Sequence, residues 1–229
     1  MKGFKTAFFF LNCMEDNLGQ EQVWDAIAPL WNKYKTEQFG NRGGLIGNLK
    51  LLEGFIEKSD KKILDLGCGS GRNFFKFNGI IYGVDFSKEQ LKFAEQNAKK
   101  KGFNVKLFRS EAYNLPFEDN FFDKALFIST LHSIKTNESR TNSLRELNRV
   151  LKLEGRAIIT VWNKNSKRWK NKPKEKMVSW DLGDGNKVLR YYYLYDSDEL
   201  RGDLEKAGFK VVKESRGDAR NLIFIVEKQ

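Results

Sequence analysis

Apolar and polar residues alternate in blocks along the middle of the chain, and the block lengths predict strands separated by helices. Five apolar runs, each bounded by turn-forming residues, have the length of buried strands. Helical spacing between most of these runs predicts a helix that opens near Arg72, one over 87–102 with Ser87 as N-cap, and one over 138–152. The succession predicts an α/β fold whose parallel sheet is covered by helices on both faces. The runs are KILDLGCG (62–69), IIYGVDFS (80–87), NVKLFRS (104–110), FDKALFIST (122–130) and GRAIITVWN (155–163).

Two predicted helices precede the sheet, because apolar residues recur at helical spacing within residues 23–34 and 45–56. The apolar start of the chain is similar to a signal peptide, but its core is barely eight residues long and lacks a small-residue cleavage site. We therefore expect residues 1–19 to be an arm that docks on the body, unless translation starts at Met14.

One helix and two strands are predicted after the sheet. The helix covers residues 197–208, with Ser197 as its N-cap and Gly208 as its end. An antiparallel pair follows at 210–217 and 221–228. We expect a single domain over residues 20–229, with a helical cap (20–58), a cofactor-binding core (60–162), a basic aromatic insert (163–195) and a C-terminal helix with its strand pair (196–229).

More than half of the formal net charge of +11 lies in the insert. Residues 163–176 hold seven Lys or Arg against one Glu, which gives a net charge of +6. A field of this sign attracts polyanions. With Trp162, Trp169 and Trp180 interleaved, the run is typical of an RNA-facing surface with stacking platforms; the alternative is a solvated lysine-rich loop.

Composition excludes several classes of protein. With two cysteines and one histidine, the chain cannot assemble a Cys/His zinc site of its own. No apolar stretch reaches the roughly 18 residues that a membrane helix needs. We expect a soluble protein of the reducing cytoplasm.

Three glycines follow the first predicted strand and indicate a ligand-binding turn. Gly67, Gly69 and Gly71 let the backbone turn sharply and approach a ligand closely. A dinucleotide fingerprint needs its third glycine where Arg72 stands, and no Gly-Lys-Ser/Thr follows, so nicotinamide and P-loop chemistry are disfavoured. Asp85 ends the second strand fourteen residues after Gly71, where a carboxylate can accept hydrogen bonds from both hydroxyls of a ribose.

Four motifs closely resemble those of class I S-adenosylmethionine-dependent methyltransferases: DLGCGSG (65–71), GVDFS (83–87), SEAYNLPFEDNFFD (110–123) and ELNRVLKLEGRAIIT (146–160). The resemblance implies a Rossmann-like, seven-stranded, mostly parallel sheet with an antiparallel last strand, and S-adenosylmethionine as cofactor. Glu111 departs from the family's usual Asp, and the longer acid should still reach the adenine edge. The cofactor-binding residues implied are Asp65, Gly67, Cys68, Gly69 and Gly71 for the methionine part, Asp85 for the ribose, Phe86, Glu111 and Ala112 for the adenine, and Ser129.

Three flanking segments resemble one subfamily, the tRNA wobble-uridine carboxymethyl methyltransferases: VWDAIAPLW (23–31), LHSIKTNESR (131–140) and VLRYYYLYDSDEL (188–200). With the ending DARNLIFIVEK, the resemblance covers about residues 20–228. It implies that the acceptor is the carboxylate of a 5-carboxymethyluridine in the anticodon loop of a tRNA. The substrate-binding candidates are Lys35, His132, Arg190, Tyr191 and Tyr193.

Two of these candidates depart from the subfamily: Lys35 stands where an arginine is usual, and Tyr193 where a histidine is usual. A carboxylate with a reference pKa near 4 is already ionised at pH 7, so its attack needs no general base. We expect Arg190 to bind the carboxylate or a phosphate, and Tyr191 or Tyr193 to contact the base. Along a strand, Arg190 and Tyr192 share one face and Tyr191 and Tyr193 the other, so only one pair can line the pocket.

A protein partner is also implied by the resemblance, because catalytic chains of this subfamily work with a small zinc-binding activator that pairs with the sheet edge. In this fold the third strand, NVKLF (104–108), is an edge strand whose apolar residues need cover.

Two other functions fit parts of the sequence. A small-molecule methyltransferase, such as one acting on a quinone precursor, accounts for the glycine loop but not for the basic insert. An RNA-binding or assembly protein with a vestigial cofactor pocket accounts for the insert, but the intact Asp65, Gly67, Gly69 and Asp85 argue against it.

Overall fold

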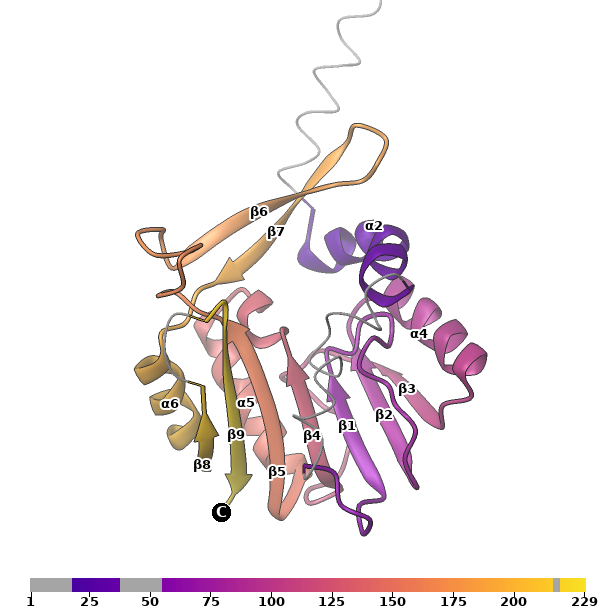
Figure 1. The fold of residues 1–229 in the computed structure, drawn as a ribbon, viewed down its shortest axis with the longest axis vertical. Helices are drawn as coiled ribbons and strands as arrows, with labels where there is room; N and C mark the ends of the chain where they lie inside the picture. The colour runs from indigo at the N-terminus through magenta and orange to yellow at the C-terminus, as the bar shows by residue number, and fades with distance from the viewer. Residues whose placement is uncertain (1–17, 38–54, 216–218) are drawn as a thin grey trace, which may run out of the picture.

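The computed structural model describes residues 18–37, 55–215 and 219–229, and a seven-stranded sheet forms its centre (Figure 1). The strand order is β3-β2-β1-β4-β5-β9-β8, with β1 to β5 parallel and β9 antiparallel to both of its neighbours. The five predicted strands and the antiparallel pair that follows them are confirmed. The strands are β1 (Lys62–Leu66), β2 (Ile80–Asp85), β3 (Val105–Arg109), β4 (Phe122–Ile128), β5 (Leu151–Trp162), β8 (Phe209–Glu214) and β9 (Asn221–Lys228).

Helices cover both faces of the sheet, as the sequence predicts. Ala94 of α4 shares an apolar cluster with Ile81, whereas Leu144 of α5 belongs to the cluster around Tyr82. Because Ile81 and Tyr82 are neighbours on β2, they point to opposite faces, and so the two helices lie on opposite sides. The helices are α2 (Gln20–Trp31), α4 (Lys88–Lys101), α5 (Asn137–Val150) and α6 (Ser197–Lys206), with a π-helix at Asn32–Glu37 and a 3-10 helix at Leu131–Ser133.

The helix starts follow from their capping side chains, with one correction to the sequence prediction. Ser87 caps α4 as predicted, because its Oγ accepts a hydrogen bond from the amide of Gln90 at 3.1 Å. The N-cap of α6 is Asp196, whose carboxylate accepts from the amide of Glu199 at 2.9 Å. The prediction of Ser197 as the cap was therefore wrong by one residue, since Ser197 is the first helical residue.

The helix predicted to open near Arg72 does not form. Residues 69–73 make successive turns, in which the amide of Gly71 bonds to the carbonyl of Cys68 and the amide of Phe74 to that of Gly71. Gly71 has a φ of 79°, and this left-handed conformation cannot continue a right-handed helix. The N-terminal arm, Met14 and nearly all of the predicted helix at 45–56 lie outside the described residues.

A separate two-stranded sheet stands beyond the carboxyl ends of the parallel strands, beside α2 (Figure 1). It consists of β6 (Glu175–Asp181) and β7 (Lys187–Tyr193), paired antiparallel. Val188 of β7 packs with apolar side chains of α2. The side chain of Gln20 accepts a hydrogen bond at Oε1 from the backbone amide of Tyr191 at 2.9 Å, and its Nε2 donates to the carbonyl of Leu189 at 3.4 Å. We call α2, β6 and β7 together the cap; unlike the helical cap expected from the sequence, it includes this strand pair.

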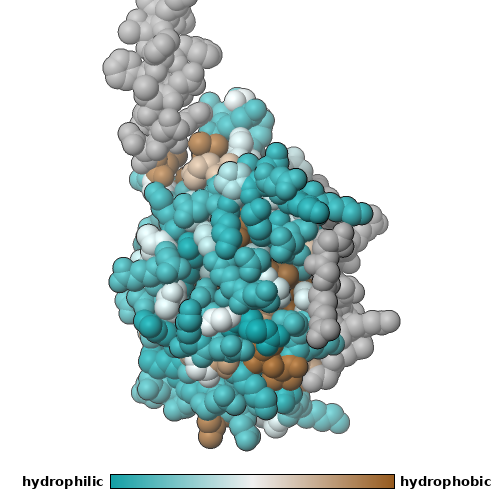
Figure 2. All heavy atoms as spheres, turned by 90° about the vertical axis from the view of Figure 1, so that its left-hand side faces the viewer, coloured by the Kyte–Doolittle hydropathy of each residue, from teal (hydrophilic) through white to brown (hydrophobic). Residues whose placement is uncertain are grey.

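The two edges of the large sheet differ in their side chains. Figure 2 shows that the side carrying α6 and β8 is largely hydrophilic, with only separate apolar spots. On β8, Lys210 and Lys213 are exposed and a bulge interrupts the pairing with β9, two features that protect a strand edge. On β3, Leu107 and Phe108 are half-buried. Within the described part of the chain, no helix has the length and apolar character to cross a membrane.

Candidate active site

A cavity of about 670 Å³ lies between the carboxyl ends of the parallel strands and the cap. In open α/β sheets, ligands bind in this position. Strand ends contribute Leu66, Asp85 and Ile128 to its lining, and the cap contributes Trp180 and Arg190, among others. Residues that lie as far apart in the sequence as Gln20 and Asn221 therefore surround one space.

The glycine loop after β1 forms part of the cavity wall. Gly67, Gly69 and Gly71 all have positive φ, of 71°, 52° and 79°. A Cβ on Gly67 would lie 2.2 Å from the Oγ1 of Thr130, so only glycine fits there. Gly67, Cys68 and Gly69 line the cavity, whereas Gly71 packs against Phe74 outside the lining.

Asp85 lies at the cavity wall and holds the glycine loop in place. One carboxylate oxygen accepts from the amide of Gly69 at 2.8 Å and the other from the amide of Ser87 at 2.9 Å. Burial raises the pKa of Asp85 to about 6, against the opposing effect of these hydrogen bonds. Each oxygen keeps a second lone pair for a ligand that donates a hydrogen bond.

Asp65 is fully buried and lies outside the cavity lining, which departs from the direct contact predicted for it. Its Oδ1 accepts a hydrogen bond from the side-chain Nδ2 of Asn73 at 3.4 Å, and Asn73 does line the cavity. Its Oδ2 has no hydrogen-bond partner among the described residues. Burial raises the pKa of Asp65 to about 7, and the nearby Asp85 adds to this. Asp65 thus lies behind the cavity wall and contacts it through Asn73.

The remaining cofactor candidates lie along the cavity beyond the ends of β2, β3 and β4. Phe86, Glu111, Ala112 and Ser129 all line it. Burial raises the pKa of Glu111, and Glu21 adds to the effect. Ser129 has a φ of 55°, rare for a non-glycine residue, and its amide bonds to the carbonyl and the hydroxyl of Thr160.

The other end of the cavity is basic and aromatic. Repulsion from three arginines, Arg72, Arg220 and Arg190, adds to burial in lowering the pKa of Lys35. All four cations line the cavity together with Lys135 and Arg168. The carboxylates of the described lining, Asp85 and Glu111, lie at the opposite end, beyond the ends of β2 and β3. The cavity is therefore polarised. The aromatic residues of its lining include Trp24, Trp31, Trp162, Trp180, Tyr192 and His132.

Arg190 is the buried centre of this basic end. Only 6% of its surface is exposed, and burial lowers its pKa. Its Nη1 donates to the hydroxyl of Tyr192 at 2.7 Å, and its guanidinium lies 4.6 Å from the ring centre of Trp180. Its Nε has no hydrogen-bond partner among the described residues. A buried, partly unsatisfied guanidinium beside a cavity is suited to bind an anion.

A family model described as "Methyltransferase domain" matches residues 57–208, more than half of the chain. The chain belongs to this methyltransferase family. A crystal structure of an S-adenosylmethionine-dependent methyltransferase from Clostridium acetobutylicum has a TM-score of 0.68, with 15% identity, over 90% of this chain and 99% of that one. The predicted class I methyltransferase fold is confirmed, and family membership supports the prediction of S-adenosylmethionine as cofactor.

Two curated relatives act on different acceptors. The tRNA (carboxymethyluridine(34)-5-O)-methyltransferase of Arabidopsis thaliana is 32% identical over 62% of this chain and 32% of that protein. The 2-phytyl-1,4-naphtoquinone methyltransferase of Nostoc punctiforme is 30% identical over 66% of this chain and 57% of that protein. The matched region spans about a third of the first relative and little more than half of the second. These two matches therefore do not identify the acceptor of this chain.

His132 lines the cavity of this methyltransferase, as predicted, but as a buried ring. It is 1% exposed and stacks on Trp162 and Tyr192, with ring centres 5.2 and 5.4 Å away. Burial and the nearby Arg190 lower the pKa of His132 to about 3. The ring is therefore neutral at physiological pH and too weakly basic to serve as a general base.

Tyr191 and Tyr193 do not reach the cavity, which corrects their prediction as substrate-binding residues. The alternation of β7 places Arg190 and Tyr192 in the lining and turns the other two tyrosines away from it. Tyr191 and Tyr193 instead contact Arg140 of α5. Tyr192, which the prediction left out, is the tyrosine of the site.

Sequence reasoning also missed three arginines and misplaced one tryptophan. Arg72 was considered only as the residue that breaks the dinucleotide fingerprint and as the predicted start of a helix. Arg168 was counted only among the charges of the basic insert, and nothing in the pattern singled out Arg220. Trp169 was expected to be an exposed stacking platform, but it is 4% exposed because it lies between Trp162, at 5.1 Å, and Arg168, at 4.7 Å.

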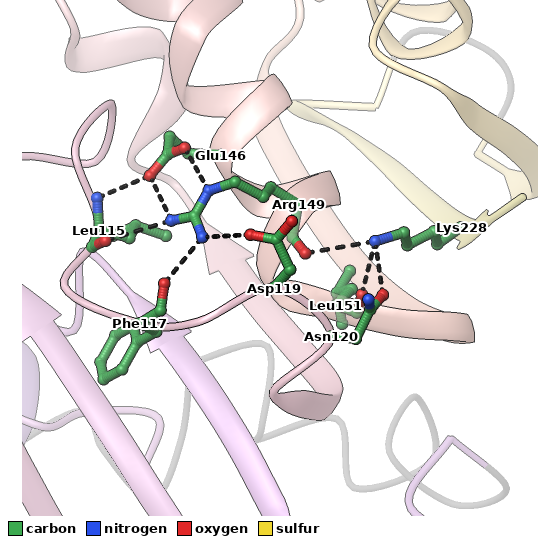
Figure 3. Close-up of polar contacts among 8 residues, drawn as sticks. All are labelled: Leu115, Phe117, Asp119, Asn120, Glu146, Arg149, Leu151 and Lys228. Atoms are coloured by element: carbon green, nitrogen blue, oxygen red, sulfur yellow. Dashed lines mark hydrogen bonds and ion pairs between the residues drawn. The ribbon is translucent and has the colours of Figure 1, made fainter.

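A polar network outside the cavity fixes the segment that follows Glu111 (Figure 3). Arg149, in the last turn of α5, pairs with Glu146 through two hydrogen bonds of 2.7 and 2.8 Å. It also donates to the carbonyls of Leu115 and Phe117 and to the carboxylate of Asp119. Glu146 accepts from the amide of Leu115 at 2.8 Å. The network therefore anchors the loop between β3 and β4.

Replacing Arg149 with methionine should lower the free energy of unfolding by roughly 2–3 kcal/mol, because it removes charge-assisted hydrogen bonds and leaves Glu146 partly buried without its partner. Urea denaturation measures this loss. The matched control is Arg145→Met on the same helix, where the exposed side chain bonds to Asn142. Equal losses for the two variants would contradict the anchoring role of Arg149.

Proposed function

We propose that this protein is an S-adenosylmethionine-dependent methyltransferase that esterifies the carboxylate of a 5-carboxymethyluridine at the wobble position of tRNA. The observation that carries the proposal is the polarised cavity. Carboxylates and glycine amides lie at one end, and the buried Arg190 lies among cations and aromatic rings at the other. Such an end favours an acceptor that is both anionic and planar.

The residues at the first end fit the methyl donor. We infer that Asp85 accepts hydrogen bonds from the ribose hydroxyls, that Phe86, Glu111 and Ala112 contact the adenine, and that the glycine loop contacts the methionine part. When bound, the donor supplies a methyl group on a positively charged sulfur. The side chains of the site then have to align the acceptor and exclude water, and orientation of this kind contributes up to about 7–11 kcal/mol.

An ionised acceptor agrees with the weak basicity of His132, the histidine of the described cavity lining. Burial and the nearby Arg190 lower the pKa of His132 to about 3. A carboxylate attacks without losing a proton, whereas a phenol or hydroxyl acceptor would need a base. We infer that Arg190 holds the carboxylate and that Lys35 and the other cavity arginines contact the carboxylate or neighbouring phosphates.

The basic insert supports RNA as the carrier of the acceptor. Lys167, Lys170 and Lys172 are exposed beside the cap, and each can neutralise a phosphate. Lys174 differs, because Asp196 and Glu199 bind it at 3.2 and 2.9 Å. The Arabidopsis relative, which is named for its action on carboxymethyluridine in tRNA, supports the same acceptor.

A small zinc-binding activator protein is part of the proposal. β3 ends the sheet on one side, and its Leu107 and Phe108 are half-buried. Phe108 continues into an aromatic cluster with Tyr82 and Phe117, at ring-centre distances of 6.0 and 4.9 Å. A partner strand that pairs with β3 would cover these groups.

A small-molecule acceptor is the second candidate, and the quinone methyltransferase of Nostoc punctiforme supports it. Quinone precursors are planar and would stack on the aromatic rings of the cavity. They carry no comparable negative charge, so they leave the cations of the cavity lining unexplained.

The deciding experiment incubates the protein with labelled S-adenosylmethionine and either total tRNA or a small-molecule extract, with and without the zinc-binding protein. We expect label in tRNA, and nucleoside digestion should place it on a carboxymethyl ester that mild alkali releases. Label confined to the extract would overturn the RNA proposal. Donor binding with no label in either pool would favour a non-catalytic RNA-binding protein.

A further inference from the structure

Arg140, near the start of α5, is a buried cation that the cavity does not use. Only 4% of its surface is exposed, and its Nε has no hydrogen-bond partner among the described residues. It contacts carbonyl oxygens, a phenol hydroxyl and an aromatic face. Burial of a charge is costly, and a cation near a helix N-terminus also opposes the helix dipole. Its contacts must therefore serve a purpose other than helix stability.

On one side, Arg140 fixes the loop that carries His132. Its Nη1 donates to the carbonyl of Ile134 at 3.0 Å and to that of Lys135 at 3.1 Å. These carbonyls lie between the 3-10 helix that contains His132 and Thr136, the N-cap of α5. The guanidinium therefore ties the exit of this loop to the helix.

On the other side, Arg140 holds the outer face of β7. Its guanidinium carbon lies 4.0 Å from the ring centre of Tyr193, and its Nη1 lies 3.4 Å from the hydroxyl of Tyr191. These tyrosines flank Tyr192, which points to the opposite face and into the cavity. Arg140 thus holds β7 by the residues on either side of Tyr192.

We propose that Arg140 is a positioning residue that sets the spacing between the two halves of the acceptor end, and this inference rests on the proposed function. One half is His132 with its loop, and the other is Arg190 with Tyr192. The halves meet in a stack, where the ring of Tyr192 lies 5.4 Å from His132 and 4.1 Å from Trp162. If β7 moved away from the loop, the stack would open and Arg190 would shift with it.

The chemistry of the contacts requires an arginine. A planar guanidinium can donate to two carbonyls and a hydroxyl while its face lies on a ring. A lysine keeps the charge and has three N–H donors, but its ammonium has no planar face that could lie on the ring of Tyr193. This difference makes Arg140→Lys a graded test.

The first experiment compares Arg140→Met, Arg140→Lys and the exposed control Arg145→Met. We expect Arg140→Met to raise the KM for tRNA at least tenfold, while the Kd for S-adenosylmethionine, measured by calorimetry, stays within twofold. Arg140→Lys should recover about a third of the loss, and Arg145→Met should match the wild type. A parallel loss of donor affinity, or an unchanged KM, would overturn the positioning role.

A spectroscopic readout follows the stack without any acceptor. Near-ultraviolet circular dichroism reports the packing of Trp162 against Tyr192, and we expect Arg140→Met to reduce this signal while the far-ultraviolet spectrum stays unchanged. If wild-type protein methylates a small molecule and not tRNA, the proposed RNA acceptor fails, whereas Arg140 is still tested by this signal and by the KM for that molecule. An unchanged near-ultraviolet signal would contradict the inference.

A second pair of variants covers the case in which Arg140→Met does not fold. Tyr193 is half-buried, and its hydroxyl also bonds to Glu199. Tyr193→Leu removes the ring face under Arg140 and should raise the KM for tRNA several-fold. Tyr193→Phe removes only the hydroxyl and should leave the KM unchanged. Equal effects of the two variants would show that the bond to Glu199, rather than the contact with Arg140, is what matters.

Discussion

Replacing Arg190 with methionine should lower kcat/KM for tRNA methylation by at least ~100-fold and leave the affinity for S-adenosylmethionine within a factor of two. Two hydrogen bonds from a guanidinium to a carboxylate contribute roughly 1.5–3 kcal/mol each, which corresponds to this loss or more. Arg190 is held ready for them, because Tyr192 and Trp180 fix its orientation at 2.7 and 4.6 Å.

Two comparisons separate the role of Arg190 from that of positive charge in general. Arg190→Lys keeps the charge and loses the planar pair of donors, so it should recover only part of the activity. Lys167→Met removes an exposed charge of the insert and should weaken tRNA binding only slightly. Single-turnover rates and calorimetry measure both steps. If Lys167→Met were as harmful as Arg190→Met, the overall field and not the buried site would govern the acceptor.

The sheet could be predicted because its signals are local. Each buried parallel strand is a short apolar run between turn residues, and the glycine loop marks the end of the first strand. The same holds for Ser87, whose capping role needs only the next three residues. Where two candidates stood side by side, as Asp196 and Ser197 do, the sequence could not rank them. The carboxylate one residue earlier is the group that meets the free amide of Glu199.

The acceptor end of the site was predictable only in part, because it is assembled from distant segments. The strand alternation showed that Arg190 and Tyr192 share a face, but only the packing of β7 on α2 and α5 decides which face meets the cavity. Arg72 and Arg220 lie almost 150 positions apart, and their common approach to Lys35 is a tertiary fact. Nothing local distinguishes such an arginine from a solvated one.

Replacing Asp85 with asparagine should weaken the binding of S-adenosylmethionine by at least ~100-fold. The substitution removes the negative charge from the group that we propose accepts hydrogen bonds from the two ribose hydroxyls. It also places an NH₂ group against the amide of Gly69 or Ser87, which loses its acceptor, so the glycine loop loses an anchor. Asp25→Asn is the matched control. Asp25 holds the same segment from the other side, through Ser87 at 2.5 Å and Glu89 at 3.1 Å, and it does not line the cavity. A comparable loss in Asp25→Asn would mean that loop rigidity, and not contact with the ribose, governs binding.

The affinity for the donor should also depend on pH through Asp85. In the free protein, burial raises the pKa of Asp85 to about 6, above its ordinary value, so its contribution to stability is present at low pH and is lost as the pH rises through 6. A ligand that donates hydrogen bonds and carries positive charge favours the ionised carboxylate and offsets the free energy that its ionisation requires in the buried site. At pH 5 about a tenth of the Asp85 carboxyl is ionised, so the Kd should be about tenfold higher than at pH 7. Calorimetry from pH 5 to 8 measures the slope. Asp65, whose pKa is raised to about 7, should change the Kd in the same direction, so any pH dependence of the Kd that persists in Asp85→Asn reports Asp65. A Kd that does not vary with pH in the wild type would show that neither carboxylate changes its ionisation when the donor binds.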